Sequence, residues 1–463
     1  MVFSSLKFVF IFMPIFFTIY YLCPNKKKNI ILLIGSLVFY FVGAFEHPEH
    51  FILLLLSIIL DFYIGLIIYN SKKYRKFFLS LGIFFHIASL FLFKYAGFIF
   101  GEINRITNSN LMTDFFLPVG ISFYTFQGIS YIVDVYRGKF KAEQSLLRFA
   151  VYISMFEQLI AGPIVTYDNV GSRLKRKTVT KNDFIVGIET FIFGLGLKVL
   201  LANPLSKLFT SVGATGYESI STVLAWMAIT AFTFHIYFDF FGYSLMAIGL
   251  GRMMGFNIPK NFDFPYISRS MTEFWRRWHI TLGNWFKEYV YIPLGGNRNG
   301  TIATMRNLLL VWLLTGIWHG AGYNFLLWGA FLAFVIIIEK LFLGKFLENH
   351  KIISHIYMIL LIPLMWAIFS IEDFDSLKLF LGRLFPLSIE SFKGPFPLDF
   401  LTPLKDYWYF FIIGFILSTK KPFELFKRIN NQYVIMTISA VIFVGSAYCM
   451  YKGFDDPFLY FRF

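Results

Sequence analysis

The sequence has little charge for its length. Only 15% of its 463 residues are Asp, Glu, Lys or Arg, whereas 57% are hydrophobic and the mean hydropathy is +0.64. A soluble protein of this size needs far more charge to cover its surface, so a soluble enzyme is excluded. Apolar runs recur along the whole chain, which predicts an all-α integral membrane protein with one polytopic domain over residues 1–463.

Cysteine is nearly absent. Cys23 and Cys449 each lie near the end of a hydrophobic run, far apart in the sequence. They form no redox pair and no metal-ligand spacing, so we interpret both as small apolar residues. The sequence also lacks a serine elbow, a Gly-rich phosphate loop and a P-loop. No tightly bound cofactor is indicated.

Acidic residues are outnumbered by basic ones, and the net charge is +15. The Lys and Arg residues cluster between apolar runs, as membrane topology requires, so nucleic-acid binding is not expected.

The first apolar run ends at Leu22 without a small-residue cleavage site, which favours a retained first helix. Lys and Arg occupy the loops 26–28 and 72–76 and are absent from the loop 46–50. The positive-inside rule therefore predicts that the N-terminus lies outside.

A helix that spans a bilayer needs about 20 mainly apolar residues, and the sequence predicts a bundle of about 11–12 of them. The candidate spans are 3–22, 30–45, 51–69, 77–99, 115–135, 184–201, 222–249, 303–318, 323–343, 353–371, 406–418 and 434–451.

Three stretches of the sequence are not expected to cross the membrane as single helices. Basic residues flank the apolar run 146–165 on both sides, so this run is expected to enter and return, buried in protein. The stretch 250–302 combines Lys and Arg with aromatics at helical spacing, such as Phe274 and Trp285, which predicts helices at the cytoplasmic interface. A membrane anchor is the simpler interpretation, and a basic platform for an anionic cytoplasmic substrate is the alternative. Residues 372–405 are expected to form an outer loop.

Ionisable residues inside apolar runs are costly and usually have a role. The candidates are Asp61, His86, Asp134, Glu157, Glu189, Lys198, His235, Asp239 and His319. Most could pair with a neighbour and pack helices together. His319 lies deeper than the rest, roughly 20 Å along a helix from Arg306. Its glycine-rich surroundings, Gly316–Gly322, allow close approach of backbone or substrate, and an imidazole can take a proton from a hydroxyl. A catalytic base and a packing histidine remain equally open.

Two further histidine groups carry weaker signals. His279 follows Arg276 and Arg277, which suit phosphate contact, but an interfacial aromatic and basic belt explains the same pattern. His47 and His50 share a short outer loop with two glutamates. Further metal ligands are missing there, so we favour a solvated loop and predict no metal site.

Many ordered segments together resemble the membrane-bound O-acyltransferases, within them the bacterial alginate and peptidoglycan O-acetylation branch. The segments are Phe93–Ala96, Leu117–Gln127, Ile132–Gly138, Gln158–Ile164, Phe274–Leu282, Tyr291–Arg298, Trp318–Gly322 and Trp328–Gly329. Departures from the branch occur at Leu245, Glu157 and Thr166, where an acid, a proline and an arginine are usual.

The resemblance implies a bundle around a central funnel in the bacterial inner membrane. It also implies acetyl-CoA as the cytoplasmic donor and O-acetylation of an envelope or secreted polysaccharide, alginate-like or peptidoglycan. A periplasmic acetyltransferase- or esterase-like partner would finish the transfer, and membrane lipid surrounds the protein. D-alanylation of teichoic acid is a weaker option. A non-catalytic transporter or flippase of an envelope precursor is the alternative, since buried ionisable groups and broken helices suit transporters.

The resemblance also assigns roles to residues. His319 matches the catalytic histidine of the family, and His279 matches its second histidine. The expected substrate-binding residues are Arg276, Arg277, Trp278, Trp318 and Asn324.

Overall fold

The computed structural model describes residues 2–160, 162–176 and 178–453, and within these ranges it contains helices and no strand. The predicted all-α fold is therefore confirmed. The chain divides into two compact units, Met1–Phe191 with Tyr243–Lys260 and Ile192–Gly242 with Asn261–Phe463. The boundaries between the units fall within helices α10 (Lys181–Gly196) and α12 (Thr222–Met253). Because each unit combines separate stretches of chain, a single domain over residues 1–463 stays a prediction.

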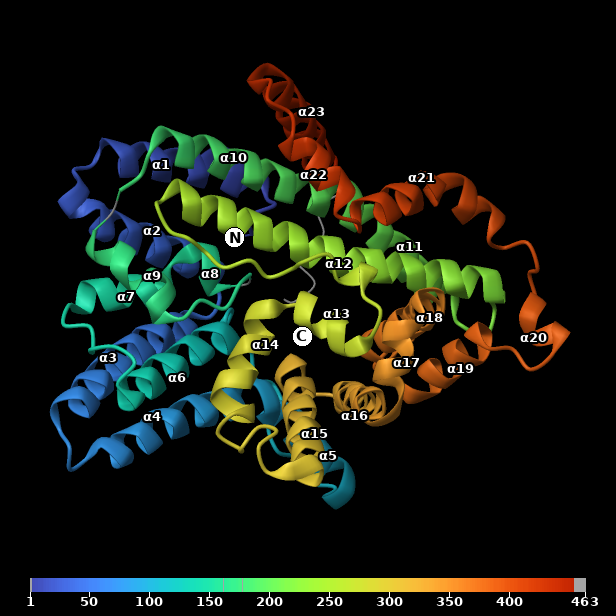
Figure 1. The fold of residues 1–463 in the computed structure, drawn as a ribbon, viewed down its shortest axis with the longest axis horizontal. Helices are drawn as coiled ribbons and strands as arrows, with labels where there is room; N and C mark the ends of the chain where they lie inside the picture. Colours follow the sequence, from blue (N-terminus) through green and yellow to red (C-terminus); the bar gives the residue numbers. More distant parts are fainter. Residues whose placement is uncertain (1, 161, 177, 454–463) are drawn as a thin grey trace. The chain divides into compact units, whose positions relative to one another are not determined.

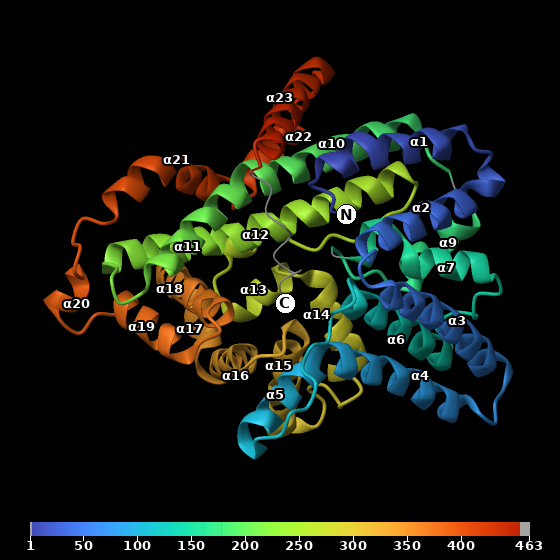
Figure 2. The same ribbon diagram turned by 180° about the vertical axis from the view of Figure 1, so that it is seen from behind.

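The remaining helices divide between the units (Figures 1 and 2). The first unit contains α1 (Met13–Leu22), α2 (Lys28–Gly43), α3 (Pro48–Asn70), α4 (Arg75–Leu90), α5 (Ala96–Thr107), α6 (Ile121–Arg137), α7 (Leu146–Ser154), α8 (Phe156–Leu159) and α9 (Tyr167–Lys175). The second unit contains α11 (Asn203–Thr215), α13 (Met271–Arg277), α14 (Ile280–Phe286), α15 (Gly300–His319), α16 (Tyr323–Ile338), α17 (Gly344–Asn349), α18 (Lys351–Ser370), α19 (Phe374–Leu384), α20 (Ile389–Lys393), α21 (Leu401–Leu417), α22 (Lys421–Lys427) and α23 (Gln432–Tyr451). Short 3-10 and π-helical turns complete them: η1 (Phe8–Phe12), η2 (Asn25–Lys27), η3 (Phe91–Tyr95), η4 (Leu197–Ala202), η5 (Pro265–Ile267), η6 (Lys287–Tyr291) and η7 (Glu339–Leu343).

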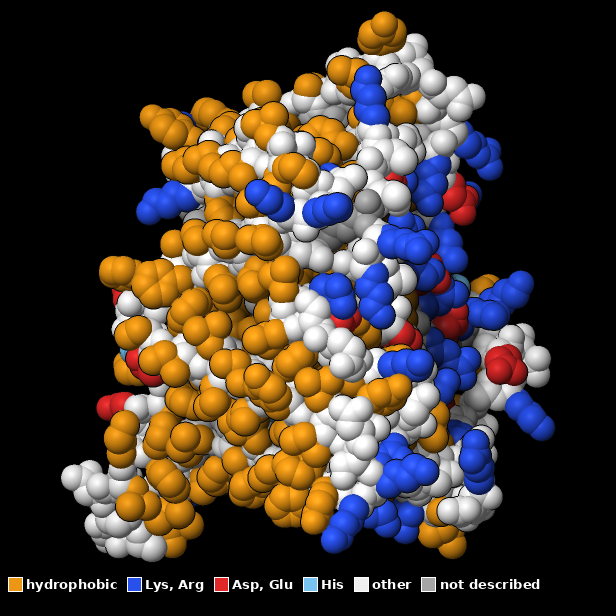
Figure 3. All heavy atoms as spheres, turned by 90° about the vertical axis from the view of Figure 1, so that its left-hand side faces the viewer, with side chains coloured by type: hydrophobic (Ala, Val, Ile, Leu, Met, Phe, Trp, Pro, Cys, Tyr) orange, Lys and Arg blue, Asp and Glu red, His pale blue; other side chains and the backbone are white. Residues whose placement is uncertain are grey.

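Eight helices in the described residues are long and apolar enough to cross a membrane. They are Pro48–Asn70, Arg75–Thr107, Lys181–Thr215, Thr222–Met253, Gly300–His319, Tyr323–Asn349, Lys351–Ser370 and Gln432–Tyr451. The other predicted spans fall on the shorter apolar helix Phe8–Leu22 and on α2, α6 and α21. Figure 3 shows a broad cover of hydrophobic side chains with Lys and Arg gathered at one side of it. This distribution is typical of a protein that crosses a bilayer and meets water at a basic face.

A buried, hydrogen-bonded histidine–carboxylate pair joins α3 to α4 in the first unit, where both helices also pack against α6 (Figures 1 and 2). Nε2 of His86 lies 2.9 and 3.0 Å from the two carboxylate oxygens of Asp61, and both residues are 1% exposed. Gly128 of α6 faces this pair, because a Cβ atom there would lie 2.2 Å from Oδ2 of Asp61. The expectation that intramembrane ionisable residues pair with a neighbour is confirmed for these two.

Replacing Gly128 by alanine is expected to lower the melting temperature of the detergent-purified protein by several degrees. The added methyl group would force Asp61 and His86 apart, and leaving a buried polar group without its hydrogen bond costs about 1–3 kcal/mol. Gly382→Ala in α19 is the matched control, because nothing lies within 4 Å of a Cβ atom built there. Equal melting temperatures for the two variants would contradict the close approach of α6 to the pair.

The structure shows which helices and hydrogen bonds form two of the three irregular stretches. The run 146–165 is divided between α7 and α8 by Met155, whose φ of −49° and ψ of 118° are not helical. The backbone N–H of Phe156 donates to Oγ of Ser36 at 3.3 Å, so this interrupted backbone is buried and satisfied as expected. Its entry and return on one face stay a prediction. Residues 372–405 are not a plain loop, because α19 and α20 form there and the Asp373 side chain caps α19 by accepting the Ser376 N–H at 2.7 Å.

Candidate active site

Two short helices of the second unit, α13 and α14, meet at His279. The helix is interrupted because Trp278 is extended and His279 has a φ of +44°, a left-handed conformation that is uncommon outside glycine. Phe274 and Trp285, expected to anchor the stretch 250–302 at the membrane interface, are buried inside the protein. The anchor interpretation of these rings is therefore wrong. An apolar helix face is the same in sequence whether it meets lipid or protein, and here it meets protein.

Asn261 fixes the state of the His279 ring. Oδ1 of Asn261 lies 3.1 Å from Nδ1 of His279 and accepts the backbone N–H of Thr281 at 3.2 Å. A backbone N–H can only donate, so Oδ1 is an acceptor and Nδ1 of His279 carries the ring proton. The lone pair then belongs to Nε2. Burial lowers the pKa of His279 to about 3, so the ring is neutral at physiological pH.

His319 is the last residue of α15 and is 4% exposed. Its ring centroid lies 5.0 Å from that of Trp328 and 5.3 Å from that of Phe369, and both contacts are nearly perpendicular. The ring of Trp318 lies 5.0 Å from His319 and 6.1 Å from His279. The rings of both predicted histidines therefore neighbour the indole ring of the predicted Trp318.

Glycines hold α15 and α16 in backbone contact beside His319. A Cβ atom at Gly316 would lie 2.3 Å from the carbonyl oxygen of Phe325, and one at Gly329 would lie 2.5 Å from that of Trp312. The close backbone approach expected around Gly316 is confirmed. Asn324, another predicted substrate-binding residue, is buried and donates to the carbonyl oxygen of Phe369 at 2.9 Å. It thus fastens α16 to the end of α18.

Sequence reasoning missed the aromatic wall that completes this site. The Trp366 ring of α18 lies 4.8 Å from the predicted Trp278 and 6.5 Å from Trp328. Phe369, one turn later on α18, contacts both His319 and Trp328. An aromatic residue in an apolar span is usually core, so the sequence held no signal for these two. Asn261 was missed as well, since only the fold brings it to His279.

A cleft of about 800 Å³ opens beside α13 in the second unit. Its charged lining residues are Asp263, Arg269, Glu273, Arg276, Arg277, Glu339, Lys340, Lys345 and Glu348. The two predicted phosphate-binding arginines differ here. Arg277 donates to Oε1 of Glu273 at 3.0 and 2.8 Å and to the carbonyl oxygen of Asp263 at 3.0 Å, whereas Arg276 is exposed.

The first turn of α13 is held by a carboxylate that sequence reasoning also missed. Glu339 is buried and accepts the backbone N–H groups of Met271 and Thr272, at 2.5 and 2.8 Å, and the hydroxyl of Tyr357 at 3.1 Å. The available signal was an acid at the end of an apolar run. Its partners place α13, and with it the cleft and His279, against α16 and α18.

Comparison with known proteins identifies the family. The model of the membrane-bound O-acyltransferase family matches residues 142–371. The probable alginate O-acetylase AlgI of Pseudomonas aeruginosa is 40% identical over 383 residues, which covers 81% of this chain and 72% of that protein. The peptidoglycan O-acetyltransferase of Helicobacter pylori is 33% identical, covering 81% and 78%. The teichoic acid D-alanyltransferase of Bacillus subtilis is 27% identical, covering 60% and 72%. The chain belongs to the membrane-bound O-acyltransferase family and is a multi-pass O-acyltransferase of the bacterial inner membrane.

Proposed function

We propose that this enzyme takes an acetyl group from acetyl-CoA on the cytoplasmic side and passes it toward a hydroxyl of an envelope or secreted polysaccharide. A periplasmic acetyltransferase- or esterase-like partner completes the transfer. The observation that carries the proposal is the pair of buried imidazoles, His319 and His279, that both neighbour Trp318. Relatives named for alginate and peptidoglycan acetylation support the acetyl group and the polysaccharide acceptor. Membership of an acyltransferase family disfavours the transporter or flippase alternative.

His319 is the general base of the proposed reaction. It takes the proton of the hydroxyl that first receives the acetyl group, while that oxygen attacks the thioester carbonyl carbon. The carbon–sulfur bond then breaks, and the departing thiolate receives the proton from the imidazolium. One ester forms for each thioester consumed, so the step needs no further reactant. The periplasmic partner later moves the acetyl group to the polysaccharide.

His279 has a different role, because its low pKa makes it a weak base. Its Nδ1–H is held by Asn261, so its Nε2 is suited to accept a hydrogen bond from an N–H or O–H of a substrate and orient it. Trp278 and Trp318 form walls around the reacting groups. Asn324 acts on the site through Phe369.

The cleft beside α13 is the proposed entry for the phosphates of acetyl-CoA. A volume of about 800 Å³ is enough for a nucleotide-sized group. Arg276 is exposed at this cleft and has a guanidinium that suits bidentate phosphate contact. Arg277 is hydrogen-bonded to Glu273 and Asp263, so its proposed role is to maintain the shape of the cleft rather than to bind phosphate.

Arg276→Ala is expected to raise the KM for acetyl-CoA about tenfold with little change in kcat, because it removes a contact made equally in the bound and transition states. The measurement is transfer of radiolabel from acetyl-CoA into base-labile ester in inverted membrane vesicles containing the polysaccharide and the partner. High salt should shrink the difference by screening the charge.

Arg298→Ala is the matched control, since Arg298 is exposed but does not line the cleft. An unchanged KM in Arg276→Ala would place the donor elsewhere. A wild-type enzyme that consumes no acetyl-CoA under these conditions would overturn the donor assignment itself.

A further inference from the structure

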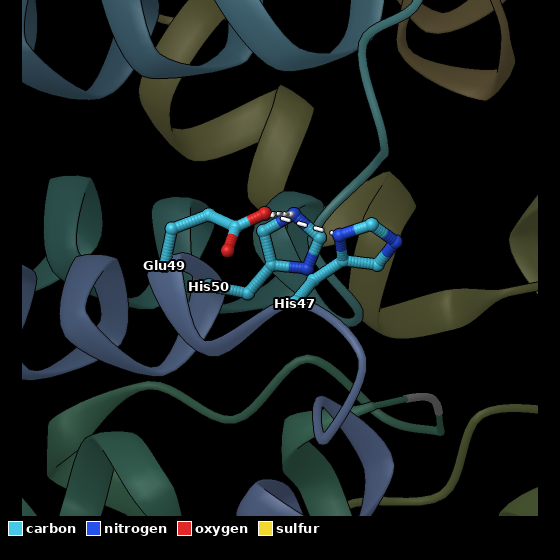
Figure 4. A group of neighbouring side chains, drawn as sticks. All are labelled: His47, Glu49 and His50. Atoms are coloured by element: carbon cyan, nitrogen blue, oxygen red, sulfur yellow. Dashed lines mark hydrogen bonds and ion pairs between the residues drawn. The ribbon is translucent and has the colours of Figure 1, made fainter.

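The start of α3 carries three side chains of the kinds that bind transition metals, and acyl transfer uses none of them. His47 is the N-cap of α3, and Glu49 and His50 lie in its first turn. One ligand atom from each side chain lies within 4.8 Å of the other two. Figure 4 shows a ring nitrogen of each histidine turned toward the carboxylate of Glu49. The Pro48 between them helps to set this first turn.

The separations suit a single ion after small side-chain movements. Nδ1 of His47 lies 3.1 Å and Nε2 of His50 lies 4.0 Å from Oε1 of Glu49. Ligand atoms roughly 2.0–2.1 Å from a tetrahedral zinc ion are about 3.3 Å apart. Glu49 is exposed, so a rotation of its side chain can close the longer separation.

A candidate fourth ligand is a backbone oxygen from a distant part of the chain, which accepts a hydrogen bond from His50 in the absence of an ion. The carbonyl oxygen of Phe116 lies 3.1 Å from Nε2 of His50. The Phe116 ring also stacks on His47 with centroids 4.1 Å apart. On its other side His50 meets the edge of Phe93, and it is only 3% exposed. Both imidazoles are thus held in place before any ion arrives, which lowers the cost of binding one.

We propose that His47, Glu49, His50 and the Phe116 carbonyl form a binding site for a divalent transition-metal ion, with Zn²⁺ as the preferred ion. Two imidazoles and one carboxylate favour such an ion over Mg²⁺ or Ca²⁺, which prefer all-oxygen ligands. Without an ion, Nδ1 of His47 donates to Glu49 and Nε2 of His50 donates to the Phe116 carbonyl, so each of these nitrogens carries the ring proton. Binding the ion would move that proton to the other ring nitrogen or to water. The bound ion would tie the start of α3 to the segment around Phe116.

This proposal revises the solvated loop expected from sequence. That expectation rested on missing ligands, and the fold supplies one through Phe116, which is 66 residues from His50. The fold also buries His50, whereas a solvated loop would leave it in water.

The test uses the full-length protein in detergent with an affinity tag that contains no histidine. Metal content after dialysis against Zn²⁺ and isothermal titration with ZnCl₂ are expected to give one ion per chain. His47→Ala and Glu49→Gln are each expected to weaken binding at least roughly tenfold. Zn²⁺ should raise the melting temperature of the wild type but not of His47→Ala, because only a protein that binds the ion is stabilised by it.

His350→Ala is the matched control, since His350 is an exposed histidine on another helix end, hydrogen-bonded to the carbonyl oxygen of Phe346. His47 is only half-buried, so His47→Ala is expected to fold even if a change at buried His50 does not. A wild type that retains no zinc, a His47→Ala protein that binds as tightly, or an equal loss in His350→Ala would each overturn the site.

Discussion

His319→Ala is expected to reduce acetyl transfer by a factor of about 10²–10⁴, the usual contribution of a general base, while the protein still inserts and folds. The buried imidazole ends α15 among Trp318, Trp328 and Phe369, so alanine removes the base and leaves the aromatic wall. The measurement is kcat for transfer of radiolabel from acetyl-CoA in inverted vesicles. The melting temperature in detergent reports on folding.

His355→Ala provides the comparison for this variant, because His355 is an exposed histidine on α18 outside the site. It is expected to keep wild-type activity. Full transfer by a properly folded His319→Ala protein would remove His319 from the mechanism. A parallel loss in His355→Ala would point to a general effect on the membrane preparation.

Lys198→Met is expected to destabilise the protein by about 3–5 kcal/mol, because it leaves the carboxylate of Asp239 buried without its cation. Nζ of Lys198 in η4 lies 2.7 Å from Oδ1 of Asp239 in α12, and both side chains are 0% exposed. A charge in such surroundings has little water to replace a lost partner. The melting temperature in detergent should therefore fall sharply.

The double variant Lys198→Met with Asp239→Leu tests this explanation. Replacing both members of a buried ion pair by apolar residues is often neutral, so the double variant should recover most of the lost stability. The non-additivity of the single and double changes measures the coupling of the two charges. A Lys198→Met protein as stable as the wild type, or a double variant worse than either single change, would contradict a mutually compensating pair.

The class of fold followed from sequence because hydrophobicity is a local property. Each apolar run could be recognised without its neighbours, and the described helices fall where those runs were predicted. The pairing of ionisable residues inside the membrane could be predicted only in part. Asp61, His86, Lys198 and Asp239 could be singled out as costly ionisable residues, but which of them paired depended on how the helices pack.

In the candidate site, only the residues that belong to recognisable sequence motifs could be predicted. His319 and His279 were found through their resemblance to a family pattern, and glycines around His319 indicated close helix contact. Asn261, Trp366 and Phe369 reach the site only through tertiary folding. The left-handed backbone at His279 could not be predicted either, because it accompanies the hydrogen bonds that Asn261 accepts from the backbone N–H groups of Ile280 and Thr281.

The glycine contact between α15 and α16 bears on how the enzyme could be redesigned. Carbonyl oxygens pack directly against Gly316 and Gly329, so at these two positions there is no side chain whose truncation could move His319. Room for a larger acyl chain would have to come from the surrounding rings, with Trp318 and Phe369 as the removable bulk around a fixed imidazole. If His319 is the base as proposed, the surrounding aromatic side chains would set the size of the acyl group, and the backbone contact between the two helices would set the position of the imidazole.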